Sequence, residues 1–153
     1  MKNKHLLYSF ILIVFYSQHV TAQKMDNKKL EKIIHQVSDS VSGQLGYWQF
    51  KYFDRYFLVI TDETHNRMRI VSPVVEEEKL DETYLKKSLE ANYHTALDVK
   101  YALADGLMWS VFIHPLKELS DEQVKDAIKQ VYSAAATFGY SYTSTELVFG
   151  TYK

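Results

Sequence analysis

The chain has 153 residues, 24% of them charged, with no cysteine and a formal net charge of −1. A domain that binds nucleic acid carries a concentrated basic patch, so this near balance of charge argues against such a role. The lack of cysteine excludes disulfide bonds and a lipid anchor on cysteine, so we expect one domain of ordinary size that is held together by packing alone.

The first 22 residues have the order of an export signal. Two lysines precede an apolar run from Leu6 to Tyr16, and small residues follow up to Ala22. The run is shorter than the roughly 20 apolar residues that span a membrane, so we expect a signal peptide over 1–22 that is cleaved after Ala22. The mature protein, 23–153, keeps 16 of the 18 Lys and Arg against 19 Asp and Glu, a net charge of −3. It would be periplasmic or secreted, without a stable membrane anchor.

The first half of the mature chain predicts one helix and three strands. The helix follows Asp26, because apolar residues recur at helical spacing up to Val41. Strands are predicted over 47–53, 56–61 and 67–72, where aromatic, β-branched and alternating residues gather, and Pro73 is expected to end the third. The segment DETHN, Asp62–Asn66, raises the question of a catalytic cluster, but its residue types favour a tight turn, which is our prediction.

The second half predicts a helix, a hairpin and a last helix. Asp81 can cap a helix that carries Tyr84, Leu85, Leu89 and Tyr93. The pair Asp105-Gly106 between two apolar runs indicates a two-residue type I′ hairpin turn. Ser120 and Gln123 have the spacing of a capping box, and an apolar face then runs from Val124 to Phe138. The tail, 140–153, is either a late edge strand or a loosely held end.

The order of these elements is helix, three strands, helix, two strands, helix. It predicts an α+β fold, in which an antiparallel sheet of about five strands has its helices on one face.

Three stretches of the sequence resemble the YbjN family and the wider type III secretion chaperone-like fold. They are RMRIVSPV (67–74), LEANYHTALDVKYALADG (89–106) and FIHPLKELSDEQV (112–124). The resemblance covers nearly all of 23–153. It implies an antiparallel sheet with helices on one face, frequent dimerisation and a role in binding other proteins, with no cofactor and no catalytic residues.

The predicted hairpin around Asp105-Gly106 is apolar on both faces. If the turn has two residues, Leu103 pairs with Met108 and Lys100 with Val111. One face then carries Val99, Tyr101, Leu103, Met108 and Phe112, and the other carries Ala102, Leu107, Trp109, Val111, Ile113 and Lys100. A sheet with helices on one side usually has a polar outer face, so the second face is either covered by the tail or a helix, or meets a partner.

We therefore take Trp109, Val111, Ile113 and Lys100 as candidate residues for binding a partner. Arg67 and Arg69 lie on one face of the third strand, and beside Trp48 or Trp109 they could rim a site for an acidic peptide or anionic ligand. The alternative is that both arginines only solvate a face.

Patterns that would indicate catalysis or a cofactor are missing. The four histidines of the mature chain lie on separate elements without metal-ligand spacing, no serine lies in a G-x-S-x-G setting, and the glycines form no phosphate loop. The sequence thus favours an exported, non-enzymatic domain that binds a protein or peptide, itself included as a homodimer, without metal or cofactor. The alternatives are an exported small-molecule binder of cystatin-like or cone-shaped α+β fold and, less favoured, a hydrolase.

Overall fold

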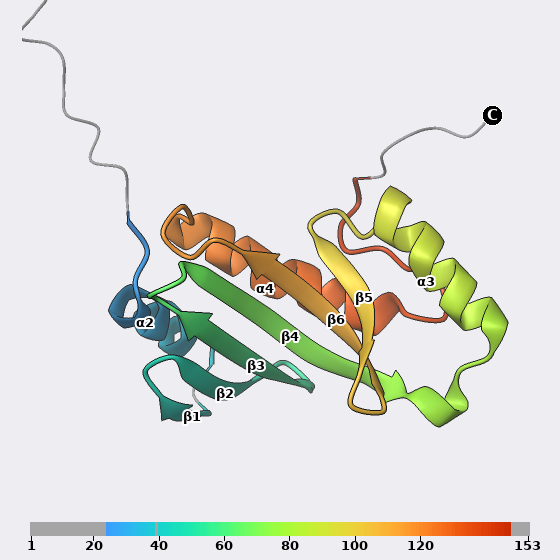
Figure 1. Ribbon diagram of the computed structural model, residues 1–153, viewed down its shortest axis with the longest axis horizontal. Helices are drawn as coiled ribbons and strands as arrows, with labels where there is room; N and C mark the ends of the chain where they lie inside the picture. The colour runs from blue at the N-terminus through green and yellow to red at the C-terminus, as the bar shows by residue number, and fades with distance from the viewer. Residues whose placement is uncertain (1–23, 39, 148–153) are drawn as a thin grey trace, which may run out of the picture.

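The computed structural model describes residues 24–38 and 40–147, which form a six-stranded antiparallel sheet and three α-helices (Figure 1). The helices are α2 (Asn27–Val37), α3 (Glu82–His94) and α4 (Asp121–Thr137), with a short 3₁₀ helix over Glu77–Lys79. The strands are β1 (Val41–Gln44), β2 (Tyr47–Tyr52), β3 (Arg55–Asp62), β4 (Arg67–Glu76), β5 (Val99–Ala104) and β6 (Leu107–His114). The predicted α+β class is confirmed, with one strand more than expected.

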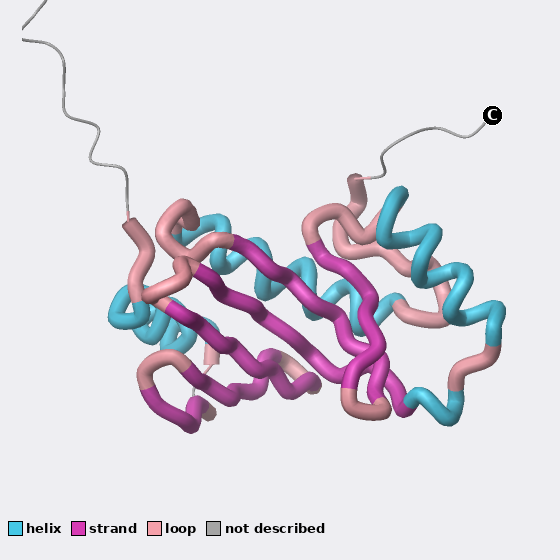
Figure 2. Tube along the Cα trace, viewed as in Figure 1, coloured by secondary structure: helices cyan, strands magenta, loops and turns pink. Residues whose placement is uncertain are grey.

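The strands lie in the order β1-β2-β3-β4-β6-β5, and each neighbouring pair is antiparallel (Figure 2). Helices α2 and α4 lie behind the sheet in the view of Figure 1, where α4 contacts β4, β5 and β6. Helix α3 lies beside β5, at the edge of the sheet. The two helices of the back layer thus cover one face, which we call the inner face.

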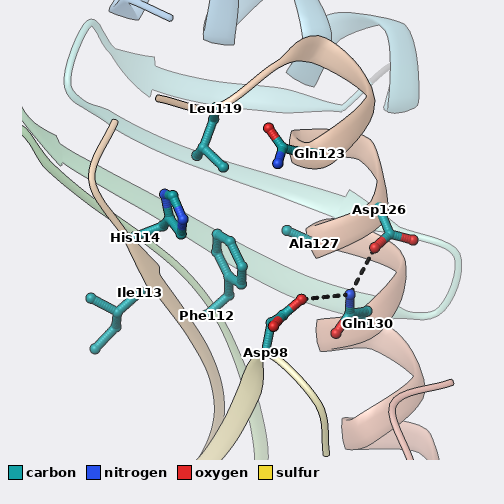
Figure 3. A pocket seen from close by; sticks show the side chains of 9 residues that line it. All are labelled: Asp98, Phe112, Ile113, His114, Leu119, Gln123, Asp126, Ala127 and Gln130. Atoms are coloured by element: carbon teal, nitrogen blue, oxygen red, sulfur yellow. Dashed lines mark hydrogen bonds between the residues drawn. The ribbon is translucent and has the colours of Figure 1, made fainter. Parts of the chain in front are cut away.

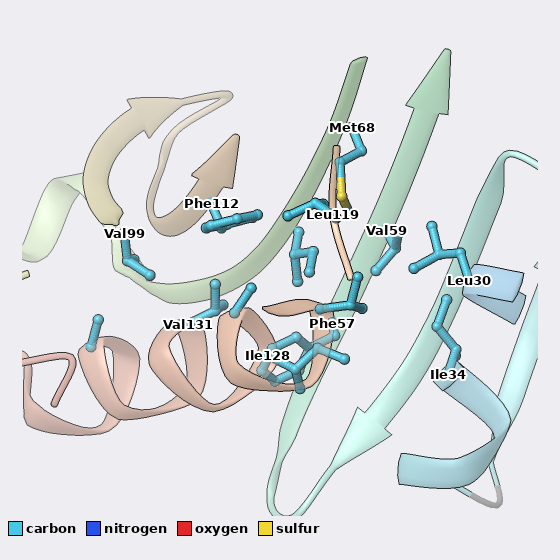
Figure 4. Close-up of a cluster of buried hydrophobic side chains, with 14 of the residues drawn as sticks. Leu30, Ile34, Phe57, Val59, Met68, Val99, Phe112, Leu119, Ile128 and Val131 are labelled. Atoms are coloured by element: carbon cyan, nitrogen blue, oxygen red, sulfur yellow. The ribbon is translucent and has the colours of Figure 1, made fainter. Parts of the chain in front are cut away.

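A hydrophobic cluster fills the space between the inner face and these two helices (Figure 4). Alternate residues of the strands point into it, as the twofold period of a strand requires. Those of β2, β3 and β4 are at most 2% exposed: Trp48, Phe50, Phe57, Val59, Met68 and Ile70. Burying one large apolar side chain stabilises the fold by about 1.5–3 kcal/mol, so this packing carries the stability of a chain without disulfides.

The predicted helix starts are confirmed by their hydrogen bonds. The Asp81 carboxylate accepts from the backbone N–H of Tyr84 at 3.0 Å. The Ser120 hydroxyl accepts from the N–H of Gln123 at 3.2 Å, and the Gln123 side chain accepts from the N–H of Ser120 at 2.8 Å. These bonds satisfy amide groups that the first turn of a helix leaves without partners.

Two buried hydroxyls fasten the hairpin to α4. Tyr101 on β5 donates to the backbone carbonyl of Ala134 at 2.7 Å, and its cross-strand partner Ser110 donates to that of Val131 at 2.9 Å. Burial raises the pKa of Tyr101 to about 12, so its hydroxyl keeps its proton at neutral pH. These bonds fix which face of the hairpin lies against the helix.

The first helix ends earlier than predicted. It stops at Val37, Ser38 takes an extended conformation, and Val41 begins strand β1 opposite Phe50. Val41 continues the helical spacing of apolar residues by coincidence, and a short apolar segment does not distinguish a helix end from a strand. This is why the sheet has six strands where about five were predicted.

Strand β4 continues through Pro73, where the sequence predicted its end. Its pairing with β3 stops at Val71, so β4 beyond that residue has β6 as its neighbour on one side alone. Proline lacks a backbone N–H and is tolerated where a strand has an unpaired side. The register with β6 shifts between Pro73 and Val75, and the pairing of the two strands then continues to Glu76.

Helix α3 and the described part of the tail close the β5 end of the sheet. The Asn92 amide accepts from the N–H of Tyr101 at 2.7 Å and donates to its carbonyl at 3.1 Å. The predicted apolar residues Leu89 and Tyr93 are exposed instead, and α3 buries Ser88 and Ala91. Residues 140–147 of the tail form no strand. The Ser144 N–H donates to the carbonyl of Thr95. The predicted signal, 1–22, and residues 148–153 lie outside the described residues.

The predicted turn of the hairpin is confirmed, and so is its register. Asp105 and Gly106 have φ values of 53° and 73°, and Leu103 pairs with Met108. A Cβ atom at Gly106 would meet no atom within 4 Å, so a substitution there tests the backbone alone.

We expect Gly106→Val to lower the free energy of unfolding by about 1 kcal/mol or more, because a β-branched residue is disfavoured at positive φ. Gly106→Asn is the matched control and should lose less, since asparagine tolerates this conformation. Urea denaturation of the three proteins measures both effects. Equal midpoints for the wild-type and valine proteins would contradict the turn.

Candidate functional site

The face of the sheet opposite the helices carries an apolar surface, which Arg69 interrupts at one end. We call it the outer face and define it by Leu58 and Ile60 on β3, Val71 on β4, and Trp109, Val111 and Ile113 on β6. The register places them side by side: Leu58 pairs with Val71, which pairs with Val111. The apolar surface predicted for one hairpin therefore extends over three adjacent strands.

The outer face has no cover among the described residues. No described helix or loop crosses the front of the sheet in Figure 1, and the described tail packs beside α3. Val71 at the centre is 8% exposed because its neighbours on the same face surround it, while Ile113 at the end of β6 is 58% exposed. Leu58, Ile60, Trp109 and Val111 are half-buried, so part of each side chain is open to a partner.

Basic side chains lie within the outer face and at its border. Arg69 lies between Ile60 on β3 and Ile113 on β6, and Lys100 on β5 pairs with Val111. A hollow of about 400 Å³ lies at this end of the sheet, and Ile60, Asp62, Arg67, Arg69 and Ile113 are among the residues that line it. The six residues singled out from the sequence thus share one face. Burial lowers the pKa of Lys100, an effect that the charge of Asp98 opposes.

The two tryptophans lie on opposite faces, which corrects one expectation. Trp48 is 1% exposed on the inner face, where its ring nitrogen lies 3.4 Å from the Glu31 carboxylate, so it cannot accompany the arginines. Trp109 lies on the outer face with its indole N–H donating to the Ala104 carbonyl at 3.0 Å. Trp109 shares the outer face with Arg67 and Arg69, but its partner on β4 is Pro73, four residues from Arg69, so it does not lie beside the arginines either.

A second hollow, of about 310 Å³, lies where β6 runs past the start of β5 (Figure 3). Its walls come from the end of β6, the loop before β5 and one side of α4. Asp98, His114, Asp126 and Gln130 bring polar groups to it, and Ile113 lines both hollows. A ligand that crosses Ile113 can therefore reach both of them.

The segment Asp62–Asn66 is a turn, as predicted. The Asp62 carboxylate accepts from the N–H of His65 at 2.9 Å and lies 2.6 Å from its Nδ1. These bonds lower the pKa of Asp62. Asn66 has a φ of 54° and its side chain accepts from the N–H of Lys117 at 2.8 Å, which joins the turn to the loop before α4. The groups of this segment thus serve to close the turn.

The histidines do not converge on a metal site in the part of the chain that the structure describes. His35, His65, His94 and His114 lie on α2, the β3–β4 turn, α3 and β6. Within residues 24–38 and 40–147, no three His, Asp or Glu side chains form a group that could hold a metal ion. None of the described helices has the length and apolar character to cross a membrane.

Sequence reasoning missed Leu58, Ile60 and Val71 on the outer face, and Asp98, Asp126 and Gln130 in the second hollow. The uninterrupted apolar runs around the first three residues were a signal, since a strand with one solvated face alternates. For Gln130, the signal was that a polar residue occupies a position on the buried side of α4. The two aspartates carry no local signal because they come from separate elements.

No protein-family model matches the sequence, and a search of curated proteins finds no match. Among solved structures, a chain of the HopA1–SchA chaperone–effector complex is similar, with a TM-score of 0.56 and 12% sequence identity. The match covers 73% of this chain and 94% of that chain. At this identity the likeness establishes the fold, which agrees with the chaperone-like fold that the sequence resemblance implies.

We expect His65→Ala to change the free energy of unfolding by less than about 0.5 kcal/mol, since the residue is exposed in a turn. Asn66→Val in the same turn should cost more, because it removes the bond to Lys117 and places a β-branched residue at positive φ. Chemical denaturation compares the two variants. A large loss of any activity in folded His65→Ala would make this segment a site.

Proposed function

We propose that this protein binds a segment of another protein on its outer face, in a chaperone-like role and without catalysis. The observation that carries the proposal is that Leu58, Val71 and Val111 form an apolar row across β3, β4 and β6, on the face that no described helix covers. The fold is shared with a chain of a chaperone–effector complex, and this supports the same kind of role. A YbjN-like relationship, which rests on the three resembling stretches of sequence, is part of the proposal.

The size of the outer face suits an extended segment. Three neighbouring strands about 4.8 Å apart and four residues at about 3.3 Å each give an apolar area of roughly 10 by 13 Å. A stable interface between folded proteins buries about 800 Å² on each partner, which is several times more. An extended segment can add contacts in the hollows beside this area, where a globular surface would not reach.

A different protein fits this face better than a second copy of the chain. A twofold homodimer packs the same face of two copies together, so the basic residues Arg67, Arg69 and Lys100 of both copies would gather in one interface. Like charges across an interface cost binding free energy. Acidic side chains in the bound segment would instead complement them. A homodimer through this face is therefore the less favoured arrangement.

A small-molecule binder with an apolar cavity under a curved sheet is also less favoured. The inner face, where such a cavity would lie, is filled by core side chains that include Phe57, Ile70 and Ile128 (Figure 4).

We further propose export, which rests on the sequence of residues 1–22. The expected mature product begins at Gln23, and intact-mass measurement of the protein from the producing organism tests this. An uncleaved product beginning at Met1 in the cytoplasm would overturn the proposal of export.

We expect Trp109→Glu to abolish capture of the partner by the mature protein while the far-UV circular dichroism spectrum stays unchanged. Tryptophan is a frequent hot-spot residue, so the loss of binding should exceed roughly 2 kcal/mol, about thirtyfold in Kd. The measurement is affinity capture from the envelope fraction with wild-type and variant proteins as bait, followed by titration of the captured protein.

Leu89→Glu is the matched control, because it places the same charge at a 70% exposed apolar position on α3. It should capture the partner as the wild type does. Capture that survives Trp109→Glu contradicts a binding role for the outer face. Unfolding of Trp109→Glu contradicts it as well, because the face would then belong to the core.

A further inference from the structure

The second hollow lies at a free edge of strand β6. Pairing with β5 begins at Val99 and Phe112, so Ile113 and His114 have β4 as a neighbour on one side and the hollow on the other. The hollow's volume of about 310 Å³ is at the lower end of the range for ligand pockets. It can thus receive a group of the size of one long side chain.

Two carboxylates and a buried amide face this hollow (Figure 3). Asp98 and Asp126 are exposed at its mouth, and the Gln130 amide nitrogen donates to Asp126 at 2.7 Å and to Asp98 at 3.4 Å. Gln130 is 4% exposed, and its Oε1 atom has no hydrogen-bond partner among the described residues. A buried acceptor without a donor costs roughly 1–3 kcal/mol of stability, and Gln130 Oε1 is such an acceptor.

Lys100, a cation whose charge interacts with that of Asp98, is engaged elsewhere. The ammonium group of Lys100 acts on Asp98 through its charge, but it donates to the Leu97 carbonyl and Lys100 does not line the hollow. His114 Nδ1 lies 2.8 Å from the Pro115 carbonyl, to which it donates, and its ring stacks on Phe112 with centroids 5.8 Å apart. The hollow therefore offers acceptors and flat rings, which together suit a cation.

We propose that this hollow binds the cationic side chain of an arginine or lysine from the segment that lies on the outer face. That this side chain belongs to a segment bound on the outer face rests on the proposed function. A guanidinium group has five donors, enough for both carboxylates at the mouth of the hollow. A metal ion fits less well, because no group of three or more His, Asp or Glu side chains among the described residues could hold one here. Ile113, shared by both hollows, joins the cation site to the outer face.

The test uses N-acetyl-arginine amide and N-acetyl-citrulline amide, which have nearly the same shape and differ in charge. Each is titrated into the ¹⁵N-labelled mature protein, and chemical shifts are followed by NMR. The arginine compound should shift the Gln130 side-chain amide and the backbone amides of Asp98, Ile113 and Ala127, and the citrulline compound should not. The double variant Asp98→Asn, Asp126→Asn should bind about tenfold more weakly.

Asp105→Asn is the matched control, because it removes one carboxylate at the hairpin turn, where asparagine tolerates the observed φ of 53°. It should bind the arginine compound as the wild type does. Equal shifts from citrulline, unchanged binding by the double variant, or shifts of these amides by calcium chloride but not by arginine would overturn the proposal. The titration needs no partner protein, so its failure is distinct from failure of Trp109→Glu to abolish capture.

Discussion

The structure depends on one constraint, which is that two helices can cover only one face of a sheet whose strands β3 and β6 are largely apolar on both faces. Helices α2 and α4 bury the inner face and contribute to the same core. Burial of Trp48, Phe57 and Ile70 stabilises this arrangement and fixes which side chains point outward. A shift of one residue would exchange the two faces of a strand. Packing of the core therefore fixes the register of β6, and with it the outward direction of Trp109, Val111 and Ile113.

The chain protects the edges of its sheet but leaves the outer face open. At one edge, β1 has four residues, too short to offer a long template for pairing. At the other, the Asn92 side chain bonds both backbone groups of Tyr101 and so takes the place of a further strand. Such features limit non-specific association between sheets. The open apolar face in the same molecule is therefore best explained as a surface with a use.

The sequence predicted those parts of the fold that depend on short-range chemistry. Asp105-Gly106 determined a turn and, through it, the register of a hairpin, and Ser120 with Gln123 determined the start of α4. It failed where tertiary contacts decide: Val41 has a helical phase but pairs with Phe50, and Pro73 remains in a strand because one side of β4 is unpaired there. The candidate residues on β6 could be selected from register alone.

The rest of the candidate site required the three-dimensional arrangement. Val71 becomes the centre of the outer face through its pairing with both Leu58 and Val111, which come from distant parts of the chain. Asp98 and Asp126 belong to a loop and a helix, and they approach each other because Gln130 bonds to both.

The two hollows carry opposite charge and share Ile113, so they would restrict the direction of a bound segment as well as its composition. Arg67 and Arg69 line one, and Asp98 and Asp126 line the other. A segment placed in the reverse direction would bring its acidic side chain to the carboxylates and its basic side chain to the arginines, with repulsion at both ends. Specificity of this kind arises from the unfavourable arrangement as much as from the favourable one. If the proposed function holds, an apolar face alone would accept many segments in either direction, whereas the charged hollows would select one order: acidic, apolar, basic.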